Sequence, residues 1–395
     1  MLITLSAVAQ DSVRTLAGRA LVTGKQDGSA AEARFNDPAA LAADSAGNLY
    51  VADSRNHAIR KIAADGSVFT ISVSGTAFDT PSGIAISPQG LIVSDSANHV
   101  IRRINHDGTT TLIAGIFGQS GFDDGPSSSA RFDSPLGIAV ATNGVIYVAD
   151  CGNHTIRAIA PDGAVTTFAG LAGTWGSNDG AGAAARVNGP TGLALDPEGN
   201  LFVSDSNNHT IRKISSTGAV TTFAGTPLEN GFVNGDRHAA KFFQPAELAF
   251  DTHGALYVAD SMNHAIRKIS PDGQVSTAAG LSQTFGAEDG DNGHARLYNP
   301  YGLAFLPSGE LAISDSYNQT IRRALPTAEV KISFARPISL QWNSVIGKEY
   351  RIEAASESFD AWENVGNSIK ATGQTSVVNV APPAKVSVFR VVVLP

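Results

Sequence analysis

The sequence contains a single cysteine, Cys151, among its 395 residues, and this excludes an intramolecular disulfide scaffold. Basic residues are also scarce: 28 Lys and Arg stand against 36 Asp and Glu, a formal net charge of −8. A general phosphate-binding surface is therefore not expected, and nucleic acid is an unlikely partner on charge alone. No run of 18 apolar residues occurs, which excludes a membrane-spanning helix. The chain also lacks a nucleophile elbow, a phosphate loop and a zinc-binding motif.

What the chain does contain is one phrase repeated six times. Its aspartates are spaced by 42 residues once and then by 55 residues four times, a register that chance does not produce. The copies are YVADSRNHAIRKI from Tyr50, IVSDSANHVIRRI from Ile92, YVADCGNHTIRAI from Tyr147, FVSDSNNHTIRKI from Phe202, YVADSMNHAIRKI from Tyr257 and AISDSYNQTIRRA from Ala312.

Each copy reads as four short strands. In the fourth copy these are PTGLALD from Pro190, LFVSD, TIRKI and AVTTFAG, separated by turns rich in Gly, Asn, Asp and Ser. Six antiparallel units of this kind predict an all-β fold, a six-bladed β-propeller. The last copy lacks a clear fourth strand, and SVRTLAG at Ser12 to Gly18 supplies one. We therefore expect this N-terminal strand to complete the last blade, since an open ring would expose a long sheet edge.

The phrase D-S-x-N-H-x-I-R-K-I resembles the NHL repeat over roughly residues 12 to 325. The resemblance implies a propeller fold but leaves function open, because the family and its relatives include RNA-binding and protein-binding propellers, sensor domains, lyases and lactonases.

A second repeated element, A-G-x5-G-x2-[DN]-G-x5-[RK], connects successive copies. Its acidic or amide positions are Asp27, Asp124, Asp179, Asn234 and Asp289. The connection before the second blade is shorter, so we expect five long loops and one notch near Gly75 to Pro81 around the face where ligands usually bind. These loops lack the dense oxygen ligands of calcium sites, and capped glycine turns are the expected reading.

The repeated aspartates and histidines invite a metal or catalytic interpretation. A role present in every blade is more often structural, because Asp and Asn side chains cap tight turns. We expect the arginines of the third strand to bridge neighbouring blades, with the repeated aspartates as acceptors. The repeat holds 11 of the 28 basic residues and the loops five more, which leaves few for a nucleic-acid patch.

Function is expected where the copies differ. Glu247 replaces the glycine of P-x-G-[LI]-A and should lie near the mouth of the central channel, and a solvated or salt-bridged carboxylate is the alternative to a functional acid there. The candidate binding residues are Glu247, Asp79, Trp175, Phe122, Phe232, Phe285 and Tyr301. Glu247 is the one catalytic candidate, no metal ligand is assigned, and no cofactor is expected apart from a divalent metal in the channel mouth under the enzymatic alternative.

Beyond about residue 329 the repeat stops and a new pattern begins. It resembles a small β-sandwich module of fibronectin-like size, on the residues Leu340, Trp342, Gly347, Tyr350, Ile352, Glu353, Trp362, Phe389, Arg390 and Val391. The predicted organisation is therefore residues 1–11 as a remnant of an export signal, with Ala7-Val8-Ala9 as a small-x-small site, residues 12–328 as the propeller and residues 329–395 as the sandwich.

Together these features predict an exported bacterial propeller, extracellular, periplasmic or on the cell surface. Its loop-rimmed face would recognise a peptide, protein or glycan, and the chain would act as a monomer with no membrane span. The alternative is a metal-dependent lyase or lactonase with its site at the channel mouth, so the sequence leaves catalysis undecided and leans against it.

Overall fold

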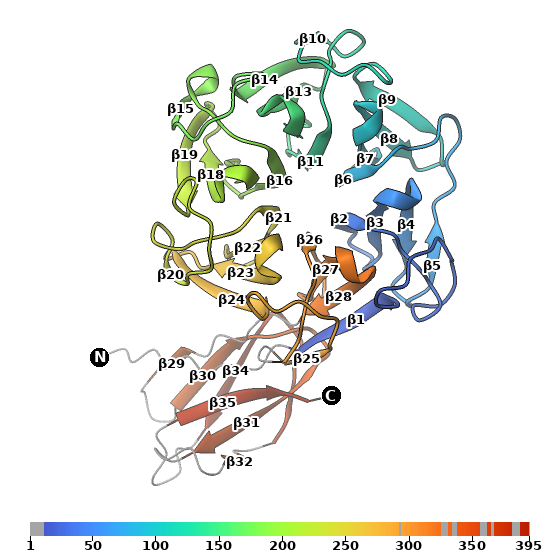
Figure 1. Cartoon of the computed structure of the whole chain (residues 1–395). Coiled ribbons are helices and arrows are strands. Elements are labelled where there is room, and N and C mark those ends of the chain that lie inside the picture. Colours follow the sequence, from blue (N-terminus) through green and yellow to red (C-terminus); the bar gives the residue numbers. More distant parts are fainter. Residues whose placement is uncertain are drawn as a thin grey trace.

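The computed structural model describes residues 12–291, 294–324, 331–333, 338–355, 362–364, 367–380 and 388–394. Within these residues the strands form eight antiparallel sheets, and six of the sheets correspond to the six sequence copies. We number them sheets 1 to 6 in chain order of their copies. Figure 1 shows them arranged around a common centre. The expected export-signal remnant at residues 1–11 lies outside the described residues.

Each copy folds as predicted into consecutive antiparallel strands, because Val, Ile and aromatic residues alternate in short runs between turn residues. The strands of sheets 1 to 3 are β2 (Pro38–Ala43), β3 (Leu49–Asp53), β4 (Ala58–Ile62), β5 (Val68–Thr70), β6 (Pro81–Ser87), β7 (Gly90–Asp95), β8 (Val100–Asn105), β9 (Thr110–Ala114), β10 (Gly125–Pro126), β11 (Pro135–Val140), β12 (Ile146–Asp150), β13 (Thr155–Ile159) and β14 (Ala164–Gly170).

The other three sheets repeat this arrangement. Their strands are β15 (Gly180–Ala181), β16 (Pro190–Leu195), β17 (Leu201–Asp205), β18 (Thr210–Ile214), β19 (Ala219–Ala224), β20 (Gly235–Asp236), β21 (Pro245–Phe250), β22 (Leu256–Asp260), β23 (Ala265–Ile269), β24 (Gln274–Gly280), β25 (Gly290–Asp291), β26 (Pro300–Phe305), β27 (Leu311–Asp315), β28 (Thr320–Ala324) and β1 (Ser12–Gly18).

The N-terminal strand joins the last copy, as its sequence predicts. β1 pairs antiparallel with β28, with Val13 opposite Ala324 and Gly18 opposite Thr320. Figure 1 shows the two ends of the repeat region meeting there, β1 in blue beside β28 in orange. Val13 and Ala17 are buried in this seam, so apolar packing supports the pairing as well as hydrogen bonds.

Short 3-10 helices form the Asp-Ser-x-Asn-His turns between the second and third strands. They are η1 (Ser54–Asn56), η2 (Ser96–Asn98), η3 (Cys151–Asn153), η5 (Ser206–Asn208), η6 (Ser261–Asn263) and η7 (Ser316–Asn318), while η4 (Gly182–Ala184) lies in a connection. Each connection runs from the end of the fourth strand of one sheet to the start of the first strand of the next sheet. Because the strands of a sheet alternate in direction, these connections lie on the same face of the ring as the turns between second and third strands. We call it the loop face.

The remaining described strands form two small sheets beyond the sixth copy. One contains β29 (Lys331–Ser333), β30 (Ile338–Asn343) and β34 (Thr375–Val380), and the other β31 (Glu349–Ala355), β32 (Trp362–Asn364), β33 (Ile369–Lys370) and β35 (Val388–Val393). Leu340, Trp342, Tyr350, Ile352 and Val391 are buried. These are residues of the predicted module pattern, so that pattern marks a local core.

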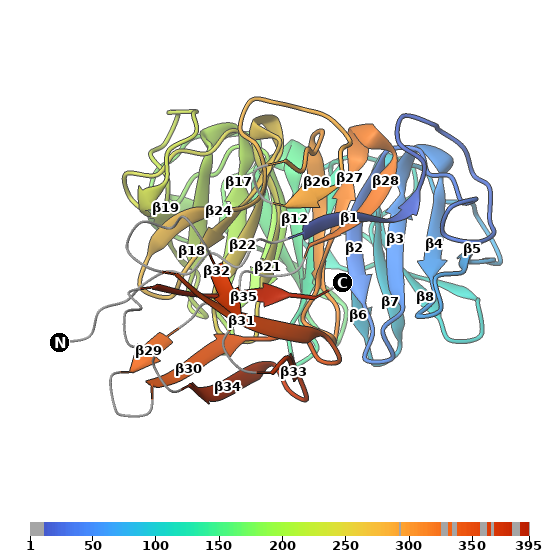
Figure 2. The same ribbon diagram turned by 90° about the horizontal axis from the view of Figure 1, so that it is seen from below.

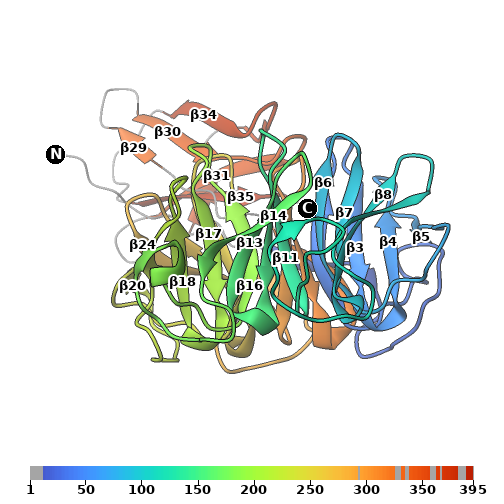
Figure 3. The ribbon, with the colours of Figure 1, turned by 90° about the horizontal axis from the view of Figure 1, so that it is seen from above.

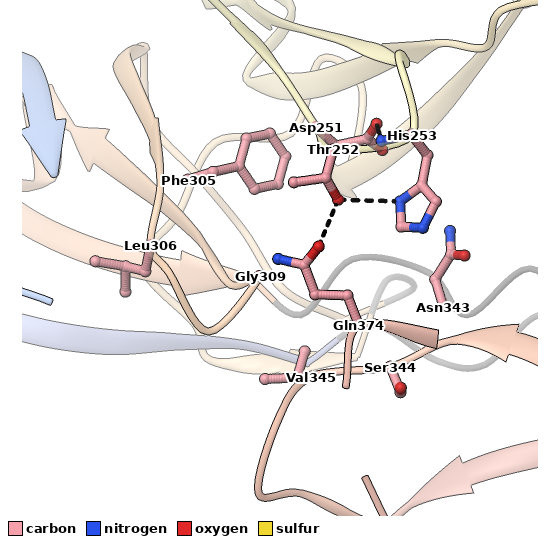
Figure 4. Close-up of a pocket in the computed structure, with 10 residues that line it drawn as sticks. All are labelled: Asp251, Thr252, His253, Phe305, Leu306, Gly309, Asn343, Ser344, Val345 and Gln374. Atoms are coloured by element: carbon pink, nitrogen blue, oxygen red, sulfur yellow. Dashed lines mark hydrogen bonds between the residues drawn. The ribbon is translucent and has the colours of Figure 1, made fainter. Parts of the chain in front are cut away.

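This C-terminal part contacts the ring on the face opposite the loop face. A cavity of about 50 Å³ there is lined by the β21–β22 turn, the β26–β27 turn and the C-terminal strands. Thr252 Oγ1 donates a hydrogen bond of 2.8 Å to Gln374 Oε1 across this junction, as Figure 4 shows. Figures 2 and 3 show the loops of the ring extending away from the C-terminal sheets. The loop face is therefore not covered by them.

Candidate functional site

The repeated aspartates form the centre of a hydrogen-bonded unit present in each of sheets 1 to 6. In sheet 4 the fully buried Asp205 accepts bonds from Asn188 N (2.6 Å), Asn208 Nδ2 (2.7 Å) and Arg212 Nη1 (2.8 Å). The equivalent aspartates Asp53, Asp95, Asp150, Asp260 and Asp315 accept the same three bonds. These bonds support a structural role for the repeated aspartates over a metal-binding or catalytic role.

The arginines bind the predicted acceptors but do not join neighbouring blades, so that expectation was wrong. Arg212 Nη1 also donates to the carbonyl of Arg186 at 2.9 Å, and Nη2 donates to Asp179 Oδ1 at 2.7 Å. Both acceptors lie in the connection that leads into the arginine's own sheet. Because a long guanidinium carries several donors in a fixed fork, it fastens the loop to the sheet rather than sheet to sheet.

The histidines perform the inter-sheet role instead. His154 Nδ1 in sheet 3 accepts a hydrogen bond of 3.0 Å from Gly189 N at the start of sheet 4. The same contact is made by His57, His99, His209 and His264. Gln319 provides the corresponding acceptor, since Asp37 N donates to Gln319 Oε1 at 2.6 Å. An acceptor Nδ1 requires the neutral ring, and burial lowers the pKa of His154 accordingly.

We predict that glutamine can replace these histidines while alanine cannot. His154→Gln should change the free energy of unfolding by less than about 0.5 kcal/mol, because Gln319 already performs the role. His154→Ala should cost about 1 to 2 kcal/mol, since it leaves the Gly189 N–H without its acceptor. Chemical denaturation measures both values. Equal losses for the two variants would contradict the acceptor role.

The aspartates of the glycine-rich connections fasten these loops to the strands of a sheet. Asp179 Oδ1 accepts from Arg212 Nη2 and from Thr222 Oγ1 at 3.1 Å, and both donors lie on strands of sheet 4. Among the described residues, no group of three or more His, Cys, Asp or Glu side chains is placed to share a metal ion. The contacts of Asp179 therefore join loop to sheet, and the predicted capping of the loop's own turn stays a prediction.

The innermost strands of the ring approach one another too closely for side chains at the repeated glycine. A Cβ at Gly83, Gly137, Gly192 or Gly302 would lie 2.0, 2.2, 2.2 or 2.2 Å from a backbone carbonyl oxygen of the next sheet. A real Cβ essentially never makes such contacts. Glycine at this position is thus a packing requirement, and a larger residue needs extra room between two sheets.

Glu247 occupies this glycine position in sheet 5, on strand β21. Glu247 is 9% exposed. Its carboxyl atom Oε2 accepts a long hydrogen bond of 3.4 Å from the adjacent backbone N–H of Leu248. No described residue forms an ion pair with it. Burial raises the pKa of the Glu247 carboxyl to about 8. The solvated or salt-bridged carboxylate that the sequence favoured is therefore wrong, because the side chain is buried without a cation.

Tyr301 lies close to Glu247 on the neighbouring strand β26. Burial raises the pKa of its hydroxyl, and the charges of Glu247, Cys151 and Asp37 raise it further. These three groups belong to sheets 5, 3 and 1, so charges from several sheets act on this hydroxyl. The structure thus brings two of the sequence-predicted residues together at the centre of the ring, and we call Glu247 and Tyr301 the central pair.

Asp79 lies elsewhere, in the short connection before sheet 2. Its Oδ1 is 3.1 Å from His57 Nδ1 and accepts from Thr80 Oγ1 at 3.1 Å, and its side chain is half exposed. Asp133 occupies the equivalent position beside His99. The position of Asp79 in the short connection therefore does not set it apart, because Asp133 makes the same contact with a histidine in another copy.

The rim aromatics separate into two kinds. Trp175, Phe122 and Phe285 are about 60% exposed on the connections, and Phe285 stacks on Tyr298 with ring centroids 4.6 Å apart. Phe232 differs, because the Arg267 guanidinium lies 4.2 Å from its ring centroid. This contact with Arg267 favours the alternative that Phe232 anchors its loop, while a binding role for Trp175, Phe122 and Phe285 stays a prediction.

Sequence reasoning missed Cys151 and two tyrosines. Cys151 stands where the other copies have serine, and four of those serines donate to a proline carbonyl of the next sheet. Burial raises the pKa of the Cys151 thiol to about 11. Tyr298 and Tyr317, with centroids 5.1 Å apart, extend the Phe285 stack. The variable position of the Asp-Ser-x-Asn-His turn was the available signal for Tyr317.

Two family descriptions match the chain. The description "SMP-30/Gluconolactonase/LRE-like region" matches residues 5–178, and "NHL repeat" matches residues 187–214. Glu247 and Tyr301 lie outside both. None of the described helices has the length and apolar character needed to cross a membrane.

Three known proteins illustrate the similarity. Protein SUPPRESSOR OF QUENCHING 1, chloroplastic, of Arabidopsis thaliana is 30% identical over 62% of this chain and 26% of its own length. Human NHL repeat-containing protein 2 is 28% identical over 84% of this chain and 44% of its own. An auxiliary nutrient binding protein from Bacteroides ovatus superimposes with a TM-score of 0.64 at 18% identity, over 80% of this chain and 77% of that one.

The chain spans less than half the length of these two curated relatives, and the structural likeness at 18% identity concerns the fold alone. Taken with the repeat and the ring of sheets, the matches support one conclusion. The chain is an all-β protein with a propeller fold of the NHL and SMP-30/gluconolactonase type.

Proposed function

We propose that the chain is an exported six-bladed propeller that binds a peptide, protein or glycan on its loop face. In this proposal residues 12–328 form the propeller, residues 329–395 form a β-sandwich module that acts as a spacer or anchor, and residues 1–11 derive from an export signal. The nutrient-binding description of the Bacteroides ovatus protein with the same fold is consistent with a binding role.

One observation carries the proposal: three large aromatic side chains are exposed on the face that the C-terminal sheets leave open. Trp175, Phe122 and Phe285 are 62, 59 and 60% exposed. Exposed rings of this size lose contact with water on binding and supply flat surfaces for sugars or peptide side chains. The central pair lies at the middle of the ring that these loops surround.

Trp175→Ala tests this assignment of the face. In a screen of glycan and peptide arrays, we expect the variant to lose at least tenfold in affinity for ligands that the wild type binds, because truncating a hot-spot tryptophan costs about 2 kcal/mol or more. Phe69→Ala, an exposed aromatic on β5, is the matched control and should bind normally. Unchanged binding by Trp175→Ala would place the site elsewhere.

A second candidate function is a metal-dependent lyase or lactonase with its site at the channel mouth. The match to the SMP-30/Gluconolactonase/LRE-like region favours it. Against it, the described part of the chain has no cluster of three His, Cys, Asp or Glu side chains that could hold a metal ion. Turnover of a lactone panel with added divalent ions, abolished by Glu247→Gln, would establish this alternative.

A further inference from the structure

The buried carboxylate at the junction of sheets 5 and 6 lacks the partner that comparable groups in this chain have. Each repeated aspartate is buried with an arginine within 3 Å, as Asp205 is with Arg212. Glu247 is equally enclosed, yet no cation of the described residues pairs with it and the neighbouring N–H is a distant donor. A buried carboxyl without a cation beside it is costly to ionise, and a ligand that brings a positive charge would supply the missing counter-ion.

The position of Glu247 indicates what kind of cation fits. The innermost strands of the ring lie so close together that a Cβ is excluded at the four glycine positions equivalent to Glu247. Tyr301 lies on β26, the innermost strand of the next sheet. Such a narrow site suits a compact ammonium on a slim methylene stem better than a planar guanidinium.

The surface around this junction suits a peptide chain. Tyr317 on η7 and Met262 on η6 are 46 and 40% exposed. Tyr298 lies against Tyr317 and stacks on Phe285. These side chains come from sheets 5 and 6 and from the connection between them. Exposed apolar side chains on the same two sheets as the buried carboxyl and its neighbour Tyr301 are complementary to a segment with apolar residues and one primary ammonium group.

We propose that the junction of sheets 5 and 6 binds a primary ammonium group of a peptide or protein ligand, with Glu247 as its counter-ion and Tyr301 beside it. This inference rests on the proposed binding function of the loop face and names the ligand class. It assigns Glu247 to recognition.

A lysine-acetylation comparison tests the proposal. A library of N-acetylated hexapeptides with one free lysine is compared with the same peptides in which the lysine is acetylated, so that the stem remains and the charge is removed. We expect the wild type to bind the free-lysine forms at least tenfold more tightly. The isosteric variant Glu247→Gln should erase this difference, and Trp175→Ala should weaken both forms equally.

Calorimetry in buffers of different ionisation heat adds a second readout. Because free Glu247 holds its proton near neutral pH, binding of an ammonium group at pH 7 should release up to about one proton in the wild type and none in Glu247→Gln. The other titratable groups acting on Tyr301 are Cys151 and Asp37, and Cys151→Ser with Asp37→Asn should leave this release unchanged.

The outcomes separate the two proposals. Equal binding of free and acetylated lysine, or a difference that survives in Glu247→Gln, overturns the ammonium site while binding through the rim stands. Binding that is confined to uncharged glycans would also overturn the ammonium site and leave binding through the rim standing. If no array member binds in a Trp175-dependent way, the loop face itself is refuted and the ammonium site with it.

Discussion

Asp205→Ala should destabilise the protein by about 3 to 5 kcal/mol, the cost expected when one partner of a buried ion pair is removed. Asp205 is fully buried and receives three donors, one from the backbone of Asn188 and two from side chains. Its loss leaves the fully buried Arg212 without its fully buried carboxylate partner, with only the half-exposed Asp179 remaining, and leaves the Asn188 N–H without an acceptor. Urea unfolding followed by tryptophan fluorescence measures the effect.

The matched control is Asp162→Ala, in an exposed turn of sheet 3 where the carboxylate accepts from Ala164 N at 3.0 Å. This variant should lose less than about 1 kcal/mol, as exposed turn contacts do. A similar loss in both variants would mean that the repeated aspartates are not the centre of each sheet's hydrogen-bonded unit.

Raising the pH from 5 to 8 should destabilise the wild type through Glu247. The folded-state pKa of about 8 lies above the ordinary value of 4.5. Between these values the folded protein holds a proton that the unfolded chain has released, so stability is full below the lower pKa and is lost as pH rises through the upper one. The slope is about 1.4 kcal/mol per pH unit, or roughly 4 kcal/mol over this range.

Glu247→Gln isolates this contribution. The variant should be more stable than the wild type at pH 8, and the difference between the two should shrink as pH falls toward 5. The histidines act oppositely, because burial lowers the pKa of His154, His209 and His264 and their contribution is lost on acidification below about 6.5. The histidines contribute equally to the free energy of unfolding of the wild type and of Glu247→Gln, so their contribution cancels in the difference between the two. A pH-independent difference would show that Glu247 is already ionised in the folded state.

The repeat made much of the fold predictable, because each copy carries its own turn residues and apolar alternation. The N-terminal strand could also be placed, since the last copy lacks a fourth strand and Ser12 to Gly18 matches one. The histidine contacts could not be predicted in this way. They depend on how one sheet lies against the next, and the acceptor role of His154 becomes visible only when Gly189 is found beside it.

The candidate site was predictable in outline through Glu247 and Tyr301, where copies depart from their common pattern. What such a comparison cannot reveal is the reason for that pattern. The carbonyl that excludes a Cβ at Gly192 belongs to a strand of the next sheet, so the reason for glycine there is a distance between two sheets. Phe232 shows the same limit, because the arginine under its ring lies in a different part of the repeat.

The pairing of β1 with β28 has a consequence for biosynthesis. The N-terminal strand leaves the ribosome first, yet its partner Thr320–Ala324 is made some 300 residues later. At about 5 to 20 residues per second, roughly 15 to 60 seconds pass before the two can meet. During that time both edges of the growing arc are unprotected and prone to pair with other chains. Productive synthesis therefore depends on keeping nascent chains apart until translation reaches the sixth copy.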